Sequence, residues 1–115
     1  KFQYGIDCYQ FLITNLLEKG ISNIHFPSYF LIFDHKKHMQ RIISYLEETG
    51  FLANGKLYKE KVEDLVKISN INVNLVIKDR IAYSKKTEEK IIENYKKMES
   101  IERVMIENML KDIQI

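Results

Sequence analysis

The sequence predicts a mostly helical α+β domain with a long C-terminal helix, and three observations lead to this fold class. Apolar residues recur with helical spacing near both ends of the chain, over residues 6–19 and 86–112. Two stretches, at Asn54-Gly55 and across residues 72–84, carry the turn and alternation signals of short β-hairpins. A basic helix is expected directly before the first hairpin. The predicted order is a core of about residues 6–84 followed by one long helix.

The composition is that of a single folded domain. The chain has 115 residues, 45% hydrophobic and 30% charged, which suffices for one hydrophobic core, so residues 1–115 are expected to form one domain. A lone cysteine, Cys8, excludes an internal disulfide and indicates an intracellular location, cytoplasmic or nuclear. No apolar run reaches the roughly 18 residues of a membrane span, so no membrane partner is expected. Because the chain begins at Lys1 without Met, it is expected to be a fragment or a processed product.

Residues 6–19 are expected to form an amphipathic helix. At helical spacing one broad face collects Ile6, Tyr9, Leu12, Ile13, Leu16 and Leu17. Gly20 is well suited to end this helix, because a left-handed residue commonly follows a helix.

Residues 29–33 leave two interpretations open. They are a short apolar run, Tyr-Phe-Leu-Ile-Phe, whose periodicity does not distinguish a buried strand from a buried helix. The aromatic and β-branched content favours a strand. Pro27 favours the start of a short helix, because the first helical position does not need its N–H.

A helix followed at once by a hairpin is expected over residues 35–58. The helix would cover residues 35–49, and Gly50 would end it. Its buried side would be Met39, Ile42, Ile43, Tyr45 and Leu46. Asn54-Gly55 is the signal of a two-residue type I′ turn, in which both residues need positive φ. The flanking residues 51–53 and 56–58 would then pair as short strands.

This order of helix, short helix, basic helix and hairpin over residues 6–58 is similar in a general way to winged helix-turn-helix domains. The resemblance implies a winged-helix-like core that binds double-stranded DNA without catalysing a reaction. The base edges would meet the outward side of the basic helix, namely Lys37, Gln40, Arg41 and Ser44, and the phosphates would meet Lys36, Lys56 and Lys59. The same residues also fit an ordinary solvated helix face.

The next segment is expected to contain a helix and a second hairpin. Residues 59–69 carry a helical pattern that includes Val62, Leu65 and Val66. Val73, Leu75 and Ile77 then alternate with polar residues, which predicts a hairpin over residues 72–84 with one buried face.

The long helix at residues 86–112 is expected to mediate contacts with another chain. At about 40 Å it is longer than a domain of this size needs. We therefore expect part of it to dimerise or to dock on a protein partner. The predicted contact residues are the Met-rich inner stripe Ile91, Tyr95, Met98, Met105, Met109 and Ile113.

Two alternative functions remain at this point. The first is a protein–protein interaction module, viral or part of a larger factor, with no nucleic-acid role. The second is a metal-dependent hydrolase, since Asp34, His35 and His38, with His25 upstream, include a spacing that can hold a transition metal. Because no fuller metal or catalytic motif is present, the chain is expected not to be an enzyme and to carry no metal or cofactor.

Overall fold

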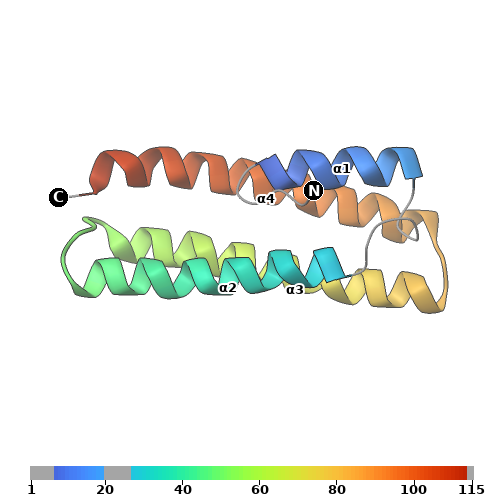
Figure 1. Cartoon of the computed structure of the whole chain (residues 1–115), viewed down its shortest axis with the longest axis horizontal. Coiled ribbons are helices and arrows are strands. Elements are labelled where there is room, and N and C mark those ends of the chain that lie inside the picture. The colour runs from blue at the N-terminus through green and yellow to red at the C-terminus, as the bar shows by residue number, and fades with distance from the viewer. Residues whose placement is uncertain (1–6, 20–26, 114–115) are drawn as a thin grey trace.

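The computed structural model describes residues 7–19 and 27–113, and within them it contains four helices and no strand. The helices are α1 (Asp7–Lys19), α2 (Pro27–Glu48), α3 (Gly55–Ile81) and α4 (Lys85–Asp112). Consecutive helices run in opposite directions along the long axis (Figure 1). In this described part, pairing of the β type is limited to an isolated bridge between Leu52 and Ile113. The described part of the chain is therefore an all-α four-helix arrangement, and the predicted α+β, winged-helix-like fold is wrong.

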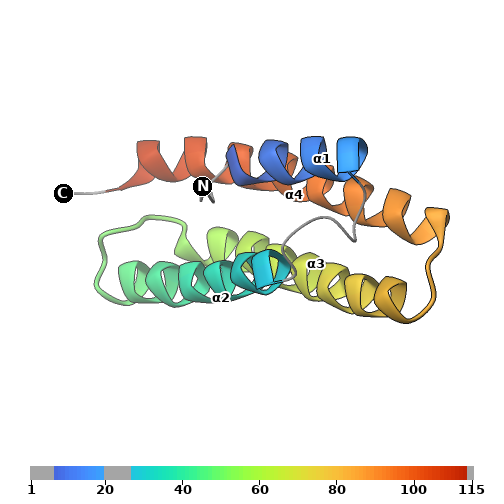
Figure 2. The same ribbon diagram turned by 45° about the vertical axis from the view of Figure 1, so that its right-hand side comes forward.

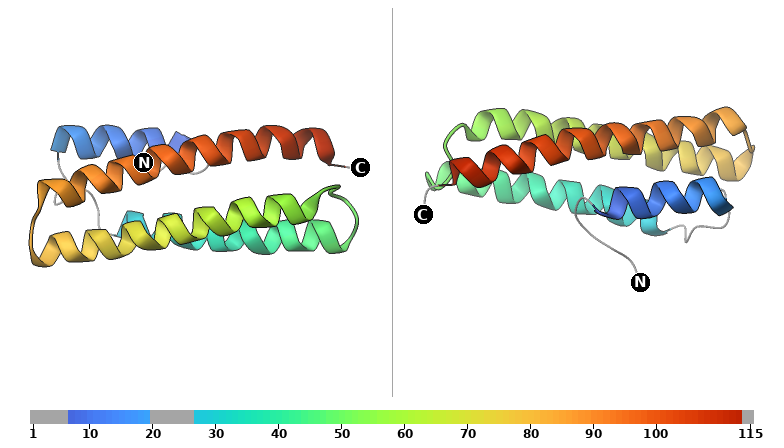
Figure 3. Two further views of the ribbon diagram at one scale, coloured as in Figure 1. Left: turned by 180° about the vertical axis from the view of Figure 1, so that it is seen from behind. Right: turned by 90° about the horizontal axis from the view of Figure 1, so that it is seen from above.

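The helices lie in two layers, with α1 and α4 in one and α2 and α3 in the other (Figure 2). The shape is elongated, 47 × 22 × 20 Å. α3 packs against both α2 and α4, whereas the shorter α1 lies beside the N-terminal half of α4 (Figure 3). The largest fully buried apolar side chains come from all four helices: Tyr9, Leu12, Leu16, Tyr29, Ile43, Leu65, Ile91, Tyr95 and Met98.

The predicted helix at residues 6–19 is confirmed over the described part, Asp7–Lys19. Residue 6 and the expected cap at Gly20 lie outside the described residues. Tyr9, Leu12, Ile13 and Leu16 are buried as expected, whereas Leu17 is 68% exposed.

The ambiguous run at residues 29–33 is helical. It belongs to α2, which begins at Pro27 and continues without a break through the predicted basic helix. The longer helix presents a different face from the one expected for residues 35–49 alone. Tyr29, Ile32 and Ile43 are buried, whereas Ile42 and Tyr45 are exposed.

The first predicted hairpin is wrong, although Gly50 ends the preceding helix as expected. Gly50, at φ 79°, follows α2, and the Phe51 N–H donates to the Leu46 carbonyl at 3.0 Å. These features form a Schellman-type helix end. Asn54 has φ 59°, but Gly55 does not share the positive φ that a type I′ turn needs. Instead Gly55 begins α3 so close to α2 that an added Cβ would lie 2.6 Å from Glu47 Cβ.

The second predicted hairpin is also wrong, because residues 72–81 complete α3. Val73 and Val76 are buried on the face that also holds Leu65, whereas Ile77 is exposed, so the alternation does not define one buried side. The buried Asn72 explains the polar residue in this pattern. Its amide donates to the Ile91 carbonyl at 3.2 Å and accepts from Asn94 Nδ2 at 2.8 Å.

The long C-terminal helix is confirmed, at Lys85–Asp112. A second helix of the same chain matches its length, because the 27-residue α3 runs alongside the 28-residue α4. An i,i+4 ion pair lies along this helix, with Arg103 Nη2 3.5 Å from Glu99 Oε2. None of the described helices combines the length and apolar character that crossing a membrane requires.

Candidate functional site

A buried ion pair joins α2 and α4 at the centre of the bundle. Lys36 Nζ lies 2.6 Å from Glu102 Oε1, and neither side chain is exposed to solvent. The Tyr9 hydroxyl of α1 donates to the same oxygen at 2.6 Å, and the Lys36 ammonium lies 5.0 Å from the Tyr9 ring centroid. Three helices therefore meet at one carboxylate.

The surroundings of this ion pair perturb two neighbouring groups. Burial, reinforced by the charge of Glu102 and the hydrogen bond to it, raises the pKa of Tyr9 well above its usual value. Burial and then the Lys36 charge lower the pKa of His35. Lys36 Nζ lies 3.2 Å from His35 Nδ1, and because an ammonium only donates, Nδ1 accepts.

These groups have acid–base character, but solvent does not reach the Lys36 and Glu102 side chains at the centre of the cluster. Glu102 Oε1 receives both donors, and Oε2 has no hydrogen-bond partner among the described residues. Because Lys36 and Glu102 are fully covered, a substrate has no access to them in this conformation. The cluster holds three helices in register.

The residues predicted to contact DNA do not form one surface. Lys36 is buried against Glu102, and Lys59 Nζ is bound to Glu47 Oε1 at 2.6 Å, which raises the pKa of Lys59. Lys56 lies in the first turn of α3, where the expected wing is absent.

The remaining four predicted DNA contacts share one side of α2. Lys37 and Arg41 are exposed, and Gln40 and Ser44 are half-buried. Lys37 also lies over the Phe33 ring, with Nζ 5.3 Å from the ring centroid. This row is compatible with an ordinary solvated face, and the hairpin that made it part of a winged helix is missing.

The predicted partner-binding stripe of α4 mostly belongs to the protein's own core. Ile91, Tyr95, Met98 and Met105 are buried, and Met109 and Ile113 are partly buried against the core. These side chains are covered by the other helices of the same chain.

The candidate metal ligands are spread over one turn of α2. Asp34 and His38 are exposed, whereas half-buried His35 contacts Lys36. Within residues 7–19 and 27–113, no group of three His, Cys, Asp or Glu side chains could hold a metal ion. His25 lies outside the described residues.

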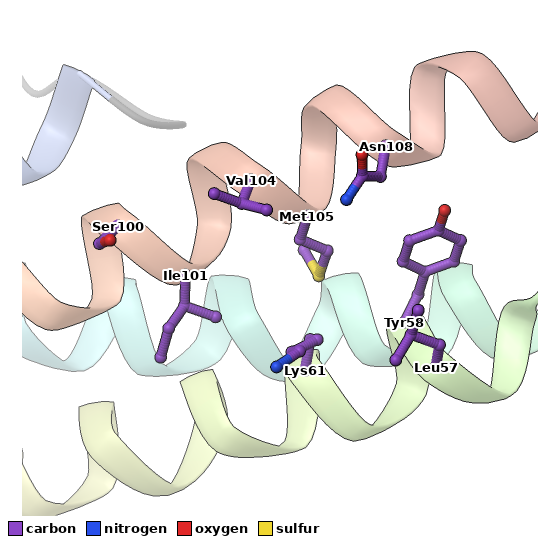
Figure 4. Close-up of a pocket in the computed structure, with 8 residues that line it drawn as sticks. All are labelled: Leu57, Tyr58, Lys61, Ser100, Ile101, Val104, Met105 and Asn108. Atoms are coloured by element: carbon purple, nitrogen blue, oxygen red, sulfur yellow. The ribbon is translucent and has the colours of Figure 1, made fainter.

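The structure instead reveals a solvent-open pocket between α3 and α4 (Figure 4). It has a volume of about 250 Å³. Leu57 and Val104 are 50% and 57% exposed on its two walls, and Tyr58 and Met105 are buried. The Tyr58 hydroxyl donates to Asp112, which raises the pKa of Tyr58 to about 12. The complete lining is Leu57, Tyr58, Lys61, Ser100, Ile101, Val104, Met105 and Asn108.

A second hollow shares Ile101 with this pocket and extends it along the same pair of helices. It is lined by Asp64, Lys67, Ile68, Lys97 and Ile101. We call the two hollows together the α3/α4 groove. The walls of the groove carry three lysines, Lys61, Lys67 and Lys97, and one acid, Asp64. The groove thus combines apolar side chains with more basic than acidic ones.

Of the apolar residues that line this groove, sequence reasoning assigned only Met105 to a site, as part of the predicted partner-binding stripe of α4. A signal was nevertheless present, because Leu57 and Val104 fall at helical spacing beside the core face of their own helices. Finding the groove required knowing that α3 begins at Gly55 and runs beside α4.

Comparisons with known proteins yield no match: no family model, no curated protein and no solved structure is significantly similar to this chain.

Proposed function

We propose that this chain is a non-enzymatic docking domain whose α3/α4 groove binds an amphipathic helix from a different protein. The observation that carries the proposal is the pair of exposed apolar residues, Leu57 on α3 and Val104 on α4, that line the same largely apolar pocket. Apolar side chains in a concave surface between two helices are a common setting for protein recognition.

The groove has the dimensions and direction of a helix-binding site. On α3 its lining runs from Leu57 to Ile68 with a spacing of three or four residues, and on α4 from Lys97 to Asn108. Each of these stretches has twelve residues, and the eleven steps between its ends cover about 17 Å, or three turns of helix. A partner helix with apolar residues at i, i+3, i+4 and i+7 would place them along this length.

Charge favours an acidic partner over a second copy of the chain. Three lysines and one aspartate line the groove, and Lys67 already pairs with Glu63 at 3.2 Å, which leaves Lys61 and Lys97 for a partner. Two copies joined through this surface would bring lysines against lysines, which is unfavourable. Asp or Glu residues flanking the apolar face of the partner helix would instead pair with Lys61 and Lys97.

A displayed library of helical peptides tests the proposal on the full chain. We expect selection to enrich peptides that combine an apolar helical face with Asp or Glu, and Val104→Asp to abolish their binding. Leu110→Asp is the matched control, because Leu110 is 71% exposed on α4 and does not line the groove. Lys61→Glu should weaken the same peptides.

Three outcomes contradict the proposal. The library yields no binder, its binders are indifferent to Val104→Asp, or sedimentation shows a dimer that Val104→Asp dissociates. The last result would assign the groove to a second copy of the chain.

The proposal includes an intracellular location, cytoplasmic or nuclear. The sequence has one cysteine, Cys8, which is buried at 3% exposure, and a lone cysteine suits a protein that depends on no internal disulfide.

A further inference from the structure

The turn between α3 and α4 forms one end of the long axis of the molecule (Figure 1). Three consecutive residues there are exposed, Ile81, Ala82 and Tyr83. Ile81 is 82% exposed and Tyr83 is 70% exposed. Leaving two large apolar side chains in water at the tip of a bundle is unfavourable unless another surface covers them.

The turn is held in place by its own hydrogen bonds. The Ser84 N–H donates to the buried Asp79 carboxylate at 3.3 Å, and the Ala82 N–H donates to the Lys78 carbonyl at 2.9 Å. The carboxylate of Asp79, which is only 6% exposed, therefore stabilises the turn. Ile81 and Tyr83 are exposed on a turn whose backbone is held by hydrogen bonds.

Exposed basic residues surround this apolar tip. Lys78 lies in the last turn of α3, and Lys85 and Lys86 lie in the first turn of α4. No acid of the described segments comes within ion-pair distance of these three lysines. Lys85 and Lys86 also oppose the helix dipole, so their position does not stabilise α4.

We propose that the α3–α4 turn is a peripheral membrane-docking tip, which inserts Ile81 and Tyr83 between the headgroups of an anionic phospholipid membrane. Lys78, Lys85 and Lys86 then lie at the level of the lipid phosphates and carboxylates. An aromatic side chain with a polar end is suited to this interfacial layer. Such docking needs no spanning helix, so it is compatible with the helices described above.

The apolar tip decides between a membrane and a nucleic acid. Both present phosphates to lysines, but only a membrane offers hydrocarbon to Ile81. The aliphatic side chain would remain in water on a nucleic-acid backbone, where phosphate contacts supply the affinity. The exposure of Ile81, 82%, therefore favours the lipid surface.

Co-sedimentation of the full chain with vesicles tests this inference. We expect binding to vesicles containing one third phosphatidylserine and little binding to phosphatidylcholine alone. Neutralising one lysine should weaken binding roughly fivefold, so Lys85→Glu with Lys86→Glu should abolish it within the range of the assay. Ile81→Ser with Tyr83→Ser should weaken binding roughly tenfold or more, because the inserted apolar area is lost.

Controls come from exposed residues elsewhere on α4. Lys111→Glu, in the last turn, and Leu110→Ser, which is also far from the tip, should leave vesicle binding unchanged. Equal binding to both kinds of vesicle, or binding that survives the Ile81/Tyr83 change, would overturn the inference. So would binding to duplex DNA that is lost with the lysines but kept without Ile81. Since Val104→Asp should not affect vesicle binding, this test is independent of the α3/α4 groove.

Discussion

Two faces of α4 differ in what they bury and what they expose. We call the side packed against the core the inner face and the side that lines the α3/α4 groove the groove face. The inner face buries Glu102 and Asn94 beside Tyr95 and Met98, and it pairs Glu102 with Lys36 and Asn94 with Asn72. The groove face leaves Val104 more than half exposed.

This difference separates what specifies the fold from what is available to a partner. A buried charge pair contributes little net stability compared with an apolar pair of similar volume, but a mispaired arrangement is strongly penalised. The Lys36–Glu102 pair and the Asn72–Asn94 pair therefore set the register of the helices. The exposed side chains of the groove, Leu57 and Val104, contribute little to the core, which leaves them available for binding.

The largest expected effect comes from breaking the inner ion pair. Lys36→Met should lower the free energy of unfolding by about 3–5 kcal/mol, because the Glu102 carboxylate is left buried without a counter-charge. Adding Glu102→Leu should restore most of this loss. Denaturant unfolding measures both, with Lys97→Met on the groove face as the control within about 0.5 kcal/mol. An unchanged stability in Lys36→Met would show that the pair does not have this role.

A smaller loss is expected at the second inner pair. Asn94→Ala removes the donor to Asn72 Oδ1, a buried oxygen, and should cost about 1–3 kcal/mol. Asn108→Ala, an exposed amide on the groove face of the same helix, should cost less than about 0.5 kcal/mol. Similar losses for both variants would remove the distinction between the two faces.

Alkaline pH should weaken the inner face through Tyr9. Its pKa is raised in the folded protein, so above pH 10 the unfolded chain loses a proton that the folded chain retains. The contribution of Tyr9 is fully present below pH 10 and decreases by about 1.4 kcal/mol per pH unit above it. Between about pH 9 and pH 11 the free energy of unfolding should therefore fall less steeply with pH in Tyr9→Phe than in the unaltered chain. Equal slopes would contradict the buried contact with Glu102.

Helical periodicity correctly predicted the first and last helices, whereas local turn signals led to wrong hairpin predictions in the middle of the chain. α1 and α4 follow from regular apolar spacing, which tertiary contacts did not override. Asn54-Gly55 suggested a hairpin, because both residues suit positive φ. The actual reason for Gly55 is the close approach of Glu47, a contact between helices that the sequence alone does not show.

The ion pair between Lys36 and Glu102 was also not predicted from the sequence. Glu102 visibly interrupts the apolar stripe of α4, which indicates a buried acid that needs a partner. Lys36 appeared to be an outward residue only because its helix was expected to begin at residue 35. With α2 beginning at Pro27, Lys36 falls on the same face as Tyr29, Ile32 and Ile43. An error in one helix boundary thus moved the key cation from the core to the surface.

Two neighbouring residues of α4, Met105 and Val104, give the finest test of the comparison, and the change at Val104 has the smallest expected effect. Met105 is 2% exposed, and Met105→Ala should cost about 2–5 kcal/mol through the lost apolar burial and the cavity that remains. Val104, one residue earlier, is 57% exposed, and Val104→Ala should change the unfolding free energy by less than about 0.5 kcal/mol. Thermal and denaturant unfolding of both variants provide the measurement. If Val104→Ala lowered the free energy of unfolding by more than 1 kcal/mol, Val104 would already stabilise the isolated chain. The groove face would then be part of the fold rather than a surface that is available to a partner.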